Sequence, residues 1–256
     1  MIRLERRDGG AAWILIDRPQ ARNAMTFEMW ETLRELALKL DADSSVKAVV
    51  ITGSSSAAFV AGTDIAAFRG FTSADGSAYE ARMHAVISAL EAIRVPVIAA
   101  IAGACTGGGV SIGAASDLRI GAPSARVGVP IARTLGNALS LANIVRVADI
   151  IGLDATKALI FGATLLDANE ALRVGFLTEI APSLETFQDY VTRAVGAIVQ
   201  RAPLTLQITK EMCRRIRAAR TLPDDADLIR LAYGSDDFRE GVDAFLKKRT
   251  PGYTGR

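Results

Sequence analysis

The stretch from Val95 to Ile120 constrains this chain most, because it joins a short apolar run to a dense set of glycines. Val97–Ile101 is apolar and is bounded by a proline and a glycine, which predicts a buried strand. Residues 107–109 are three consecutive glycines, and the small residues of 110–116 predict a closely packed helix after them. Glycines between a strand and a helix let another atom approach the backbone N–H groups.

The helix that follows the glycines suggests a use for those N–H groups. The first N–H groups of a helix lack partners within it and carry the positive end of its dipole, so they suit an anion. The pattern therefore indicates a backbone oxyanion site at Gly108. Glycines that only let a helix pack closely against a sheet would give the same pattern. The residues alone leave both interpretations open.

Length, charge and cysteine content exclude several classes of protein. A chain of 256 residues can bury a large core. The net charge of +2 has no long basic stripe beside it, which argues against a nucleic-acid partner. Cys105 and Cys213 form no disulfide framework, so we expect a cytoplasmic location. Residues 1–10 lack an apolar signal core, and polar residues dilute the apolar stretch 97–116, so we expect no membrane span.

Hydrophobic periodicity predicts alternating strands and helices up to Pro182 and helices alone after it. The predicted strands are Ala11–Asp17, Lys47–Thr52, Val97–Ile101, Asp117–Ile120 and Phe176–Ile180. The predicted helices are 27–40, 77–94, 110–116, 138–149, 155–161, 166–174, 184–200, 204–219, 224–232 and 238–248. Residues 59–65 predict a turn into a short helix, and 122–130 a loop. The pattern indicates an α/β fold with two parts, residues 1–183 and a helical region of residues 184–256.

Familiar catalytic motifs are absent from the sequence. His84, the single histidine, has no serine or aspartate at triad spacing, and no cysteine–histidine cluster has zinc spacing. The glycine run lacks the lysine of a phosphate-binding loop, and no GxGxxG opens the first strand. Nucleotide-binding enzymes of these classes are therefore disfavoured, and we expect no metal.

Four stretches together resemble one family. They are IDRPQARNAM (Ile16–Met25), AFVAGTDIAAF (Ala58–Phe68), the glycine stretch Ile101–Ile120, and DDFREGVDAFLKKR (Asp236–Arg249). In this order they resemble the crotonase superfamily, the enoyl-CoA hydratase/isomerase group. The resemblance implies a spiral of ββα repeats followed by a helical trimerisation region that forms a homotrimer or a dimer of trimers. It also implies an acyl-CoA thioester substrate, with coenzyme A as part of the substrate and no separate cofactor.

The resemblance also implies roles for particular residues. Family members hold the thioester oxygen with two backbone N–H groups, which match Thr63 and Gly108 here. Phe245 and Lys248 match positions that reach the coenzyme A of a neighbouring subunit, although a packed helix face and a solvated lysine would look the same. The expected coenzyme A contacts are Ala21, Arg22, Ala61, Gly62, Asp64, Ile65, Phe245 and Lys248.

The sequence departs from the family at its acid–base positions. A hydratase of this family uses two glutamates, and the matching positions are Ser111 and Ile131 here. A one-residue slip in the alignment would place Ala132 at the second position, which is equally unable to act as an acid. Positioned acid–base groups contribute roughly 10²–10⁴ in rate, so we expect poor hydration.

The segment after Ile131 offers the next polar candidates, namely Arg133, Thr134 and Asn137. Arg133 suits a carboxylate on the acyl group, because its planar donors match one. A solvated arginine and an asparagine that caps a helix are the alternative interpretation. The Ser111 hydroxyl could bind the acyl chain or a water molecule.

Two classes of function remain open. One is an acyl-CoA enzyme that stabilises a thioester enolate and performs isomerisation, decarboxylation or thioester hydrolysis instead of hydration. The other is a non-catalytic acyl-CoA binder or scaffold. An intact oxyanion site favours the enzyme.

Overall fold

The computed structural model describes all residues, 1–256, and is built on a six-stranded sheet in the order β1-β2-β3-β5-β7-β9. β1 pairs antiparallel with β2, and all the other pairs are parallel. The strands are β1 (Ile2–Arg7), β2 (Ala11–Ile16), β3 (Ala48–Gly53), β5 (Val97–Ile101), β7 (Leu118–Gly121) and β9 (Glu179–Ile180).

A second, three-stranded parallel sheet gives the fold its spiral character. It has the order β4-β6-β8, with β4 (Ala58–Val60), β6 (Ala104–Thr106) and β8 (Arg126–Gly128). Each of β3, β5 and β7 is followed directly by one of these short strands, so the chain steps repeatedly from the large sheet to the small one. Gly103 makes one of these steps with φ +66°, and a Cβ there would lie 2.1 Å from the Ala57 carbonyl oxygen. This arrangement confirms the predicted α/β spiral of ββα repeats.

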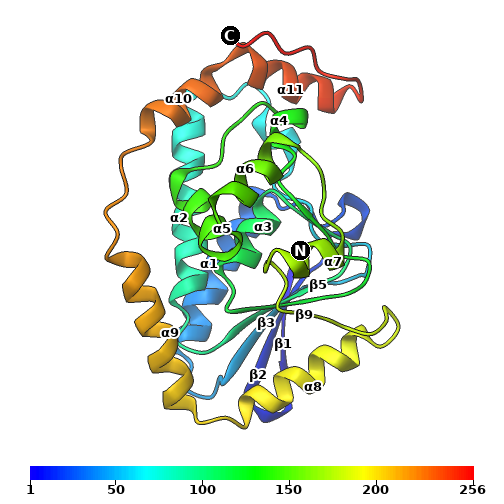
Figure 1. Cartoon of the computed structure of the whole chain (residues 1–256), viewed down its shortest axis with the longest axis vertical. Helices are drawn as coiled ribbons and strands as arrows, with labels where there is room; N and C mark the ends of the chain where they lie inside the picture. Colours follow the sequence, from blue (N-terminus) through cyan, green and yellow to red (C-terminus); the bar gives the residue numbers. More distant parts are fainter.

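Helices cover both faces of the large sheet (Figure 1). On one face, α1 (Phe27–Ala42), α2 (Ser73–Ala92) and α3 (Gly108–Ala115) enclose the main core, in which Trp30 and Leu33 are fully buried. Thr26 caps α1, because its side chain accepts a hydrogen bond from the Met29 N–H. The remaining short helices before residue 182 are η1 (Asp8–Gly10), η2 (Pro19–Ala21), η3 (Ile65–Phe68), α4 (Ile131–Thr134), α5 (Leu141–Ile151), α6 (Leu153–Phe161) and α7 (Ala168–Arg173).

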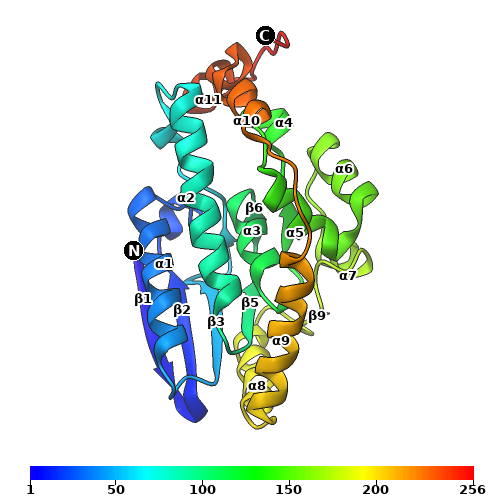
Figure 2. The same ribbon diagram turned by 90° about the vertical axis from the view of Figure 1, so that its left-hand side faces the viewer.

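Four helices follow residue 182, as the sequence predicts. They are α8 (Phe187–Val199), α9 (Pro203–Ala218), α10 (Ala226–Gly234) and α11 (Asp236–Leu246). α8 lies on the other face of the large sheet, where Phe187 and Val191 pack in one apolar cluster with Trp13. α10 and α11 lie at the far end of α2, and α9 runs along the side of the molecule (Figures 1 and 2). The division into residues 1–183 and 184–256 stays a prediction.

Several local predictions are wrong in detail. The segment 122–130 is not a plain loop, because it contains β8. The predicted strand Phe176–Ile180 is reduced to β9, since the Leu177 N–H donates to the Ala171 carbonyl at 3.0 Å and closes the end of α7 instead. β1 and the small-sheet strands were not predicted. Three-residue strands gain their hydrogen bonds from partners far along the chain, so local periodicity does not reveal them.

No helix of the chain combines the length and the apolar character needed to cross a membrane. The cytoplasmic location stays a prediction.

Candidate active site

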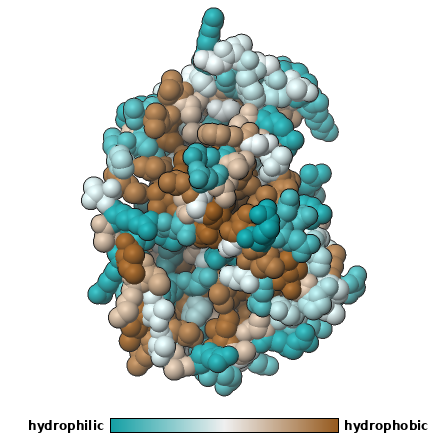
Figure 3. All heavy atoms as spheres, in the orientation of Figure 1, coloured by the Kyte–Doolittle hydropathy of each residue, from teal (hydrophilic) through white to brown (hydrophobic).

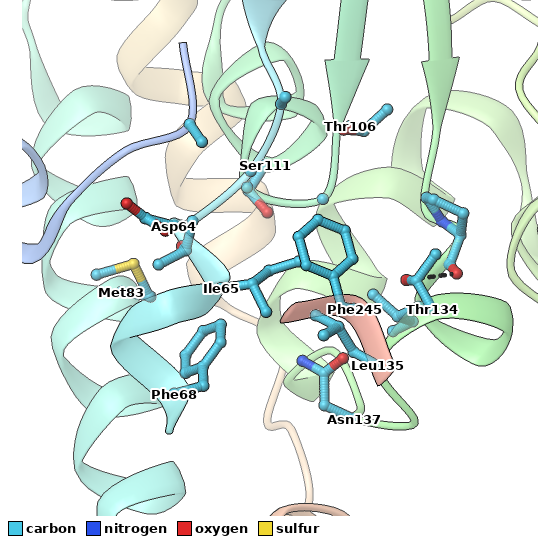
Figure 4. A pocket seen from close by; sticks show the side chains of 18 of the residues that line it. Asp64, Ile65, Phe68, Met83, Thr106, Ser111, Thr134, Leu135, Asn137 and Phe245 are labelled. Atoms are coloured by element: carbon cyan, nitrogen blue, oxygen red, sulfur yellow. Dashed lines mark hydrogen bonds between the residues drawn. The ribbon is translucent and has the colours of Figure 1, made fainter. Parts of the chain in front are cut away.

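A cavity of about 690 Å³ brings together most of the residues that the sequence singles out. Its wall comes from η2, the segment 61–65, α2, the start of α3, α4 with the turn after it, and α11. Figure 4 shows Ser111 and Asn137 on opposite sides of this view, with the ring of Phe245 between them. The predicted residues that line the cavity are Ala21, Arg22, Ala61, Gly62, Thr63, Asp64, Ile65, Gly108, Ser111, Ile131, Thr134, Asn137, Phe245 and Lys248.

The two predicted oxyanion donors line this cavity on neighbouring pieces of backbone. The N–H groups of Thr63 and Gly108 donate no hydrogen bond within the chain. Gly108 is the first residue of α3, where an N–H has no partner within the helix. A Cβ placed on Gly62 would lie 3.8 Å from the Gly108 nitrogen, so the two segments approach closely. Both N–H groups are therefore free to donate a hydrogen bond to a ligand.

The buried side chain of Trp30 contacts both donor segments. Its Nε1–H donates to the Thr63 hydroxyl at 3.0 Å, and that hydroxyl lies 2.7 Å from the Tyr79 hydroxyl. The edge of the indole ring lies against Gly108, since a Cβ on Gly108 would come within 2.7 Å of it. Only glycine fits between this ring and the cavity. Tyr79 was not predicted as a site residue, and burial raises the pKa of its hydroxyl, which stays protonated.

A buried asparagine holds the segment that carries Ala21 and Arg22. Asn23 donates from Nδ2 to the Ala58 carbonyl at 2.7 Å and accepts from the Arg18 N–H at 2.9 Å. The segment is therefore tied to β4, the strand that leads into Ala61, Gly62 and Thr63.

The two positions matched to the hydratase acids both face the cavity and carry no acid. Ser111 lies in the first turn of α3 and Ile131 is the first residue of α4, and both are buried. The Ser111 hydroxyl makes no hydrogen bond with another group of the protein, and in Figure 4 it points into the cavity. Neither side chain exchanges a proton near neutral pH.

The polar residues after Ile131 differ in whether they line the cavity. Arg133 is exposed and does not line the cavity, and its contact with an acyl carboxylate stays a prediction. In a four-residue helix that buries Ile131, the side chain two positions later points away. Thr134 lines the cavity, but its hydroxyl donates to the Pro130 carbonyl at 2.9 Å.

Asn137 caps no helix, because α5 begins after Ser140. It lines the cavity, and its Nδ2 donates to the Tyr233 hydroxyl at 3.1 Å. Its Oδ1 is buried without a partner in the protein. This oxygen can accept a hydrogen bond from a ligand or a water molecule.

Sequence reasoning missed a buried acid, Glu80, on the cavity wall. Its side chain accepts a hydrogen bond of 2.8 Å from the Tyr233 hydroxyl, and burial raises its pKa. The signal was present in the sequence. Glu80 lies three residues before Met83 and seven before Ile87, so an acid occupies the apolar face of a helix.

The expected coenzyme A contacts line the cavity, and three of them show features that the sequence did not predict. Asp64 caps η3 and pairs with Arg18 at 2.8 Å. Phe245 and Lys248 line the cavity of their own chain, whereas the family pattern predicted contact with a neighbouring subunit's ligand. In this chain α11 folds back over its own site, against η3 and α4.

Comparison with known proteins now defines the family. The sequence model of the enoyl-CoA hydratase/isomerase family matches residues 6–256, so the chain belongs to that family. A probable enoyl-CoA hydratase of Mycobacterium bovis is 32% identical over 259 residues, covering 99% of this chain and 98% of that protein. A crotonyl-CoA hydratase of Syntrophomonas wolfei is 28% identical over 248 residues, covering 96% and 95%.

Solved structures agree with this assignment. A methylmalonyl-CoA decarboxylase in complex with 2-nitronate-propionyl-CoA has a TM-score of 0.89 at 26% identity, covering 100% of this chain and 98% of that one. An enoyl-CoA hydratase/carnithine racemase from Magnetospirillum magneticum has a TM-score of 0.81 at 27% identity, covering 100% and 96%. The chain is thus an acyl-CoA-processing enzyme with the crotonase fold.

Proposed function

We propose that this enzyme decarboxylates a short carboxyacyl-CoA and stabilises the resulting thioester enolate with the N–H groups of Thr63 and Gly108. The observation that carries the proposal is the pair of unpartnered N–H groups on a cavity whose two hydratase positions hold Ser111 and Ile131. A preorganised donor of this kind contributes roughly 3–4 kcal/mol to transition-state stabilisation. The oxyanion half of the site is present, and the acids of the hydratase reaction are not.

Decarboxylation suits this combination because it needs no base to start. The carbon–carbon bond to the carboxylate breaks and its electron pair moves into the enolate, whose negative charge the two N–H groups bind. Ile65, Ile131 and Leu135 make the nearby wall apolar, and apolar surroundings favour loss of charge from a carboxylate. Hydration, by contrast, requires a water molecule that is positioned and deprotonated by the protein.

Structural similarity favours the same reaction. The methylmalonyl-CoA decarboxylase structures have TM-scores of 0.86 to 0.89 at 25% to 26% identity. The enoyl-CoA hydratase/carnithine racemase from Magnetospirillum magneticum has a TM-score of 0.81 at 27% identity. The curated relatives named above are called hydratases, so the reaction has to be decided by chemistry at the site.

The direct test is incubation of the purified protein with methylmalonyl-CoA, malonyl-CoA and crotonyl-CoA, followed by mass spectrometry of the acyl-CoA products. We expect loss of CO₂ from a carboxyacyl-CoA and little addition of water to crotonyl-CoA. Release of free coenzyme A would indicate thioester hydrolysis instead, and a shifted double bond would indicate isomerisation. Tight binding with no product from any acyl-CoA would contradict the proposal and favour the binder.

We propose in addition that the chain assembles as a homotrimer or a dimer of trimers. α9 exposes an apolar stripe at four-residue spacing, formed by Leu204, Ile208, Met212 and Ile216. Apolar side chains gather along the lower left edge of Figure 3, over α9. Such a stripe is typical of a surface that another chain covers. Light scattering that gave a monomer mass at micromolar concentration would contradict the assembly.

A further inference from the structure

We propose that Glu80 is the acid–base residue of this site and delivers its carboxyl proton to the α-carbon of the thioester enolate. This inference rests on the proposed function, since it names the group that completes the reaction there. It assigns the proton to α2, whereas the family's hydratase acids belong to the positions of Ser111 and Ile131.

The cavity wall contains only two carboxyl groups, those of Asp64 and Glu80. Asp64 is occupied, because it pairs with Arg18 at 2.8 Å and accepts the Ala66 N–H at 3.1 Å. Glu80 forms no salt bridge, and its side chain is held by neutral groups. It is therefore the carboxyl of the cavity that can change its protonation state without breaking an ion pair.

The surroundings of Glu80 favour the protonated form. Burial raises the pKa of this carboxyl, and the nearby charge of Asp225 raises it further. Hydrogen bonds from Tyr233 and Ser140 act in the opposite direction and lower the pKa, but the net shift of the pKa is upward. The other titratable neighbour is Tyr79, a buried phenol. A larger fraction of Glu80 than of an exposed glutamate thus carries a proton near neutral pH.

A chain of hydrogen bonds fixes the position of the carboxyl. The Tyr233 hydroxyl donates to Glu80 Oε1 at 2.8 Å and accepts from Asn137 Nδ2 at 3.1 Å. Burial raises the pKa of Tyr233 well above its ordinary value, so it remains a donor. Tyr233 is the positioning residue in this chain of contacts.

A glycine in α2, the helix that carries Glu80, makes room for the side chain of Tyr233. A Cβ on Gly76 would lie 2.3 Å from the side chain of Tyr233, so only glycine lets the ring approach α2 there. The close packing of α10 on α2 brings Tyr233 to Glu80.

The proposed step balances without a further reactant. The bond between the α-carbon and the carboxylate breaks, CO₂ leaves, and the electron pair spreads to the thioester oxygen held by Thr63 and Gly108. The enolate then takes the Glu80 proton at its α-carbon and becomes the saturated acyl-CoA. Glu80 is left as a carboxylate and regains a proton from water.

Exchange of α-protons tests Glu80 separately from decarboxylation. In D₂O the unmodified enzyme should exchange an α-proton of propionyl-CoA, measured by NMR, because the Glu80 carboxylate can remove it. Methylmalonyl-CoA should give propionyl-CoA with deuterium in one configuration. Glu80→Gln should slow the exchange by about a hundredfold or more and lose the single configuration. His84→Gln, an exposed change one turn further along α2, should keep both.

A second variant keeps the inference testable if Glu80→Gln does not fold. Tyr233→Phe removes a hydrogen bond that lowers the Glu80 pKa, so the pH profile of α-proton exchange should move to higher pH. An unshifted profile would contradict the role. Exchange by folded Glu80→Gln at the unmodified rate would overturn it while leaving the proposed function intact. An unmodified enzyme that neither exchanges nor decarboxylates would overturn both.

Discussion

The two halves of the cavity differ in how the protein builds them. The half that we propose as the oxyanion site presents the backbone N–H groups of Thr63 and Gly108, the second of them at the start of α3. The opposite half uses the side chains of Ser111, Ile131 and Glu80. A substitution of one side chain leaves the backbone N–H groups of the first half in place as long as the fold persists. The same kind of substitution changes the chemistry of the second half directly. Under the proposed function, the backbone supplies enolate stabilisation and the side chains determine which reaction follows.

Removal of a backbone donor should have the largest effect on activity. Gly108→Pro deletes the N–H while leaving every acid and hydroxyl of the cavity in place. Turnover of the true substrate should fall at least about a hundredfold, as for the loss of one oxyanion donor. Steady-state kinetics measure the loss, and circular dichroism checks folding. A folded variant with full activity would show that Gly108 is not a donor.

Gly108→Ala is the matched control, although it is not a mild change. It keeps the N–H, but the added Cβ would lie 2.7 Å from the Trp30 ring. Trp30 must then shift, and its hydrogen bond to Thr63 shifts with it. We expect activity between those of the unmodified enzyme and Gly108→Pro.

Rebuilding the side-chain half should produce a gain of activity. Ser111→Glu combined with Ile131→Glu restores two carboxylates on the cavity wall, at the positions where the family's hydratases carry them. Hydration of crotonyl-CoA should rise by about tenfold or more, measured by absorbance of the enoyl thioester. Each single change should do little, because the two acids act on one water molecule. Rapid hydration by the unmodified enzyme would instead show that other residues supply the acids.

The same contrast explains what the sequence could predict. Gly62, Gly107 and Gly108 mark the backbone half, because close approach and positive φ at residues 62 and 107 require glycine. Apolar and charged residues also alternate over Ile2–Glu5, a pattern typical of an edge strand such as β1.

The side chains of the second half are harder to predict from the sequence. The contact between Glu80 and Tyr233 joins residues 153 positions apart, so only the packing of α10 on α2 reveals it. The exposure of Arg133 likewise depends on how α4 packs, with Ile131 as its buried residue. Long-range packing therefore decides which side chains reach the cavity.

Burial of Glu80 should appear in the pH dependence of stability. The folded enzyme holds a proton on Glu80 at pH values where the unfolded chain has released it, because burial raises the folded pKa. The free energy of unfolding should therefore fall as pH rises from the ordinary glutamate pKa through the raised one. Urea unfolding at a series of pH values should show this slope weakened in Glu80→Gln. An unchanged slope would mean that Glu80 is ionised in the folded enzyme.

The smallest expected effect concerns the cavity mouth. Lys248→Ala should weaken binding of coenzyme A thioesters only a few-fold, because an exposed charge pair contributes about 1 kcal/mol or less. Calorimetric titration should show a larger loss in low salt than in high salt, since salt screens exposed charges. Equal losses at both salt concentrations would argue that Lys248 acts by packing.

Binding of an enolate mimic tests the central claim most directly, because it needs no turnover. A nitronate is a planar anion that resembles the enolate, and 2-nitronate-propionyl-CoA is the ligand in the decarboxylase structure described above. The unmodified enzyme should bind it at least about a hundredfold more tightly than propionyl-CoA, and Gly108→Pro should remove most of that preference. Equal affinity of the unmodified enzyme for the two ligands would contradict the backbone oxyanion site on which the whole account depends.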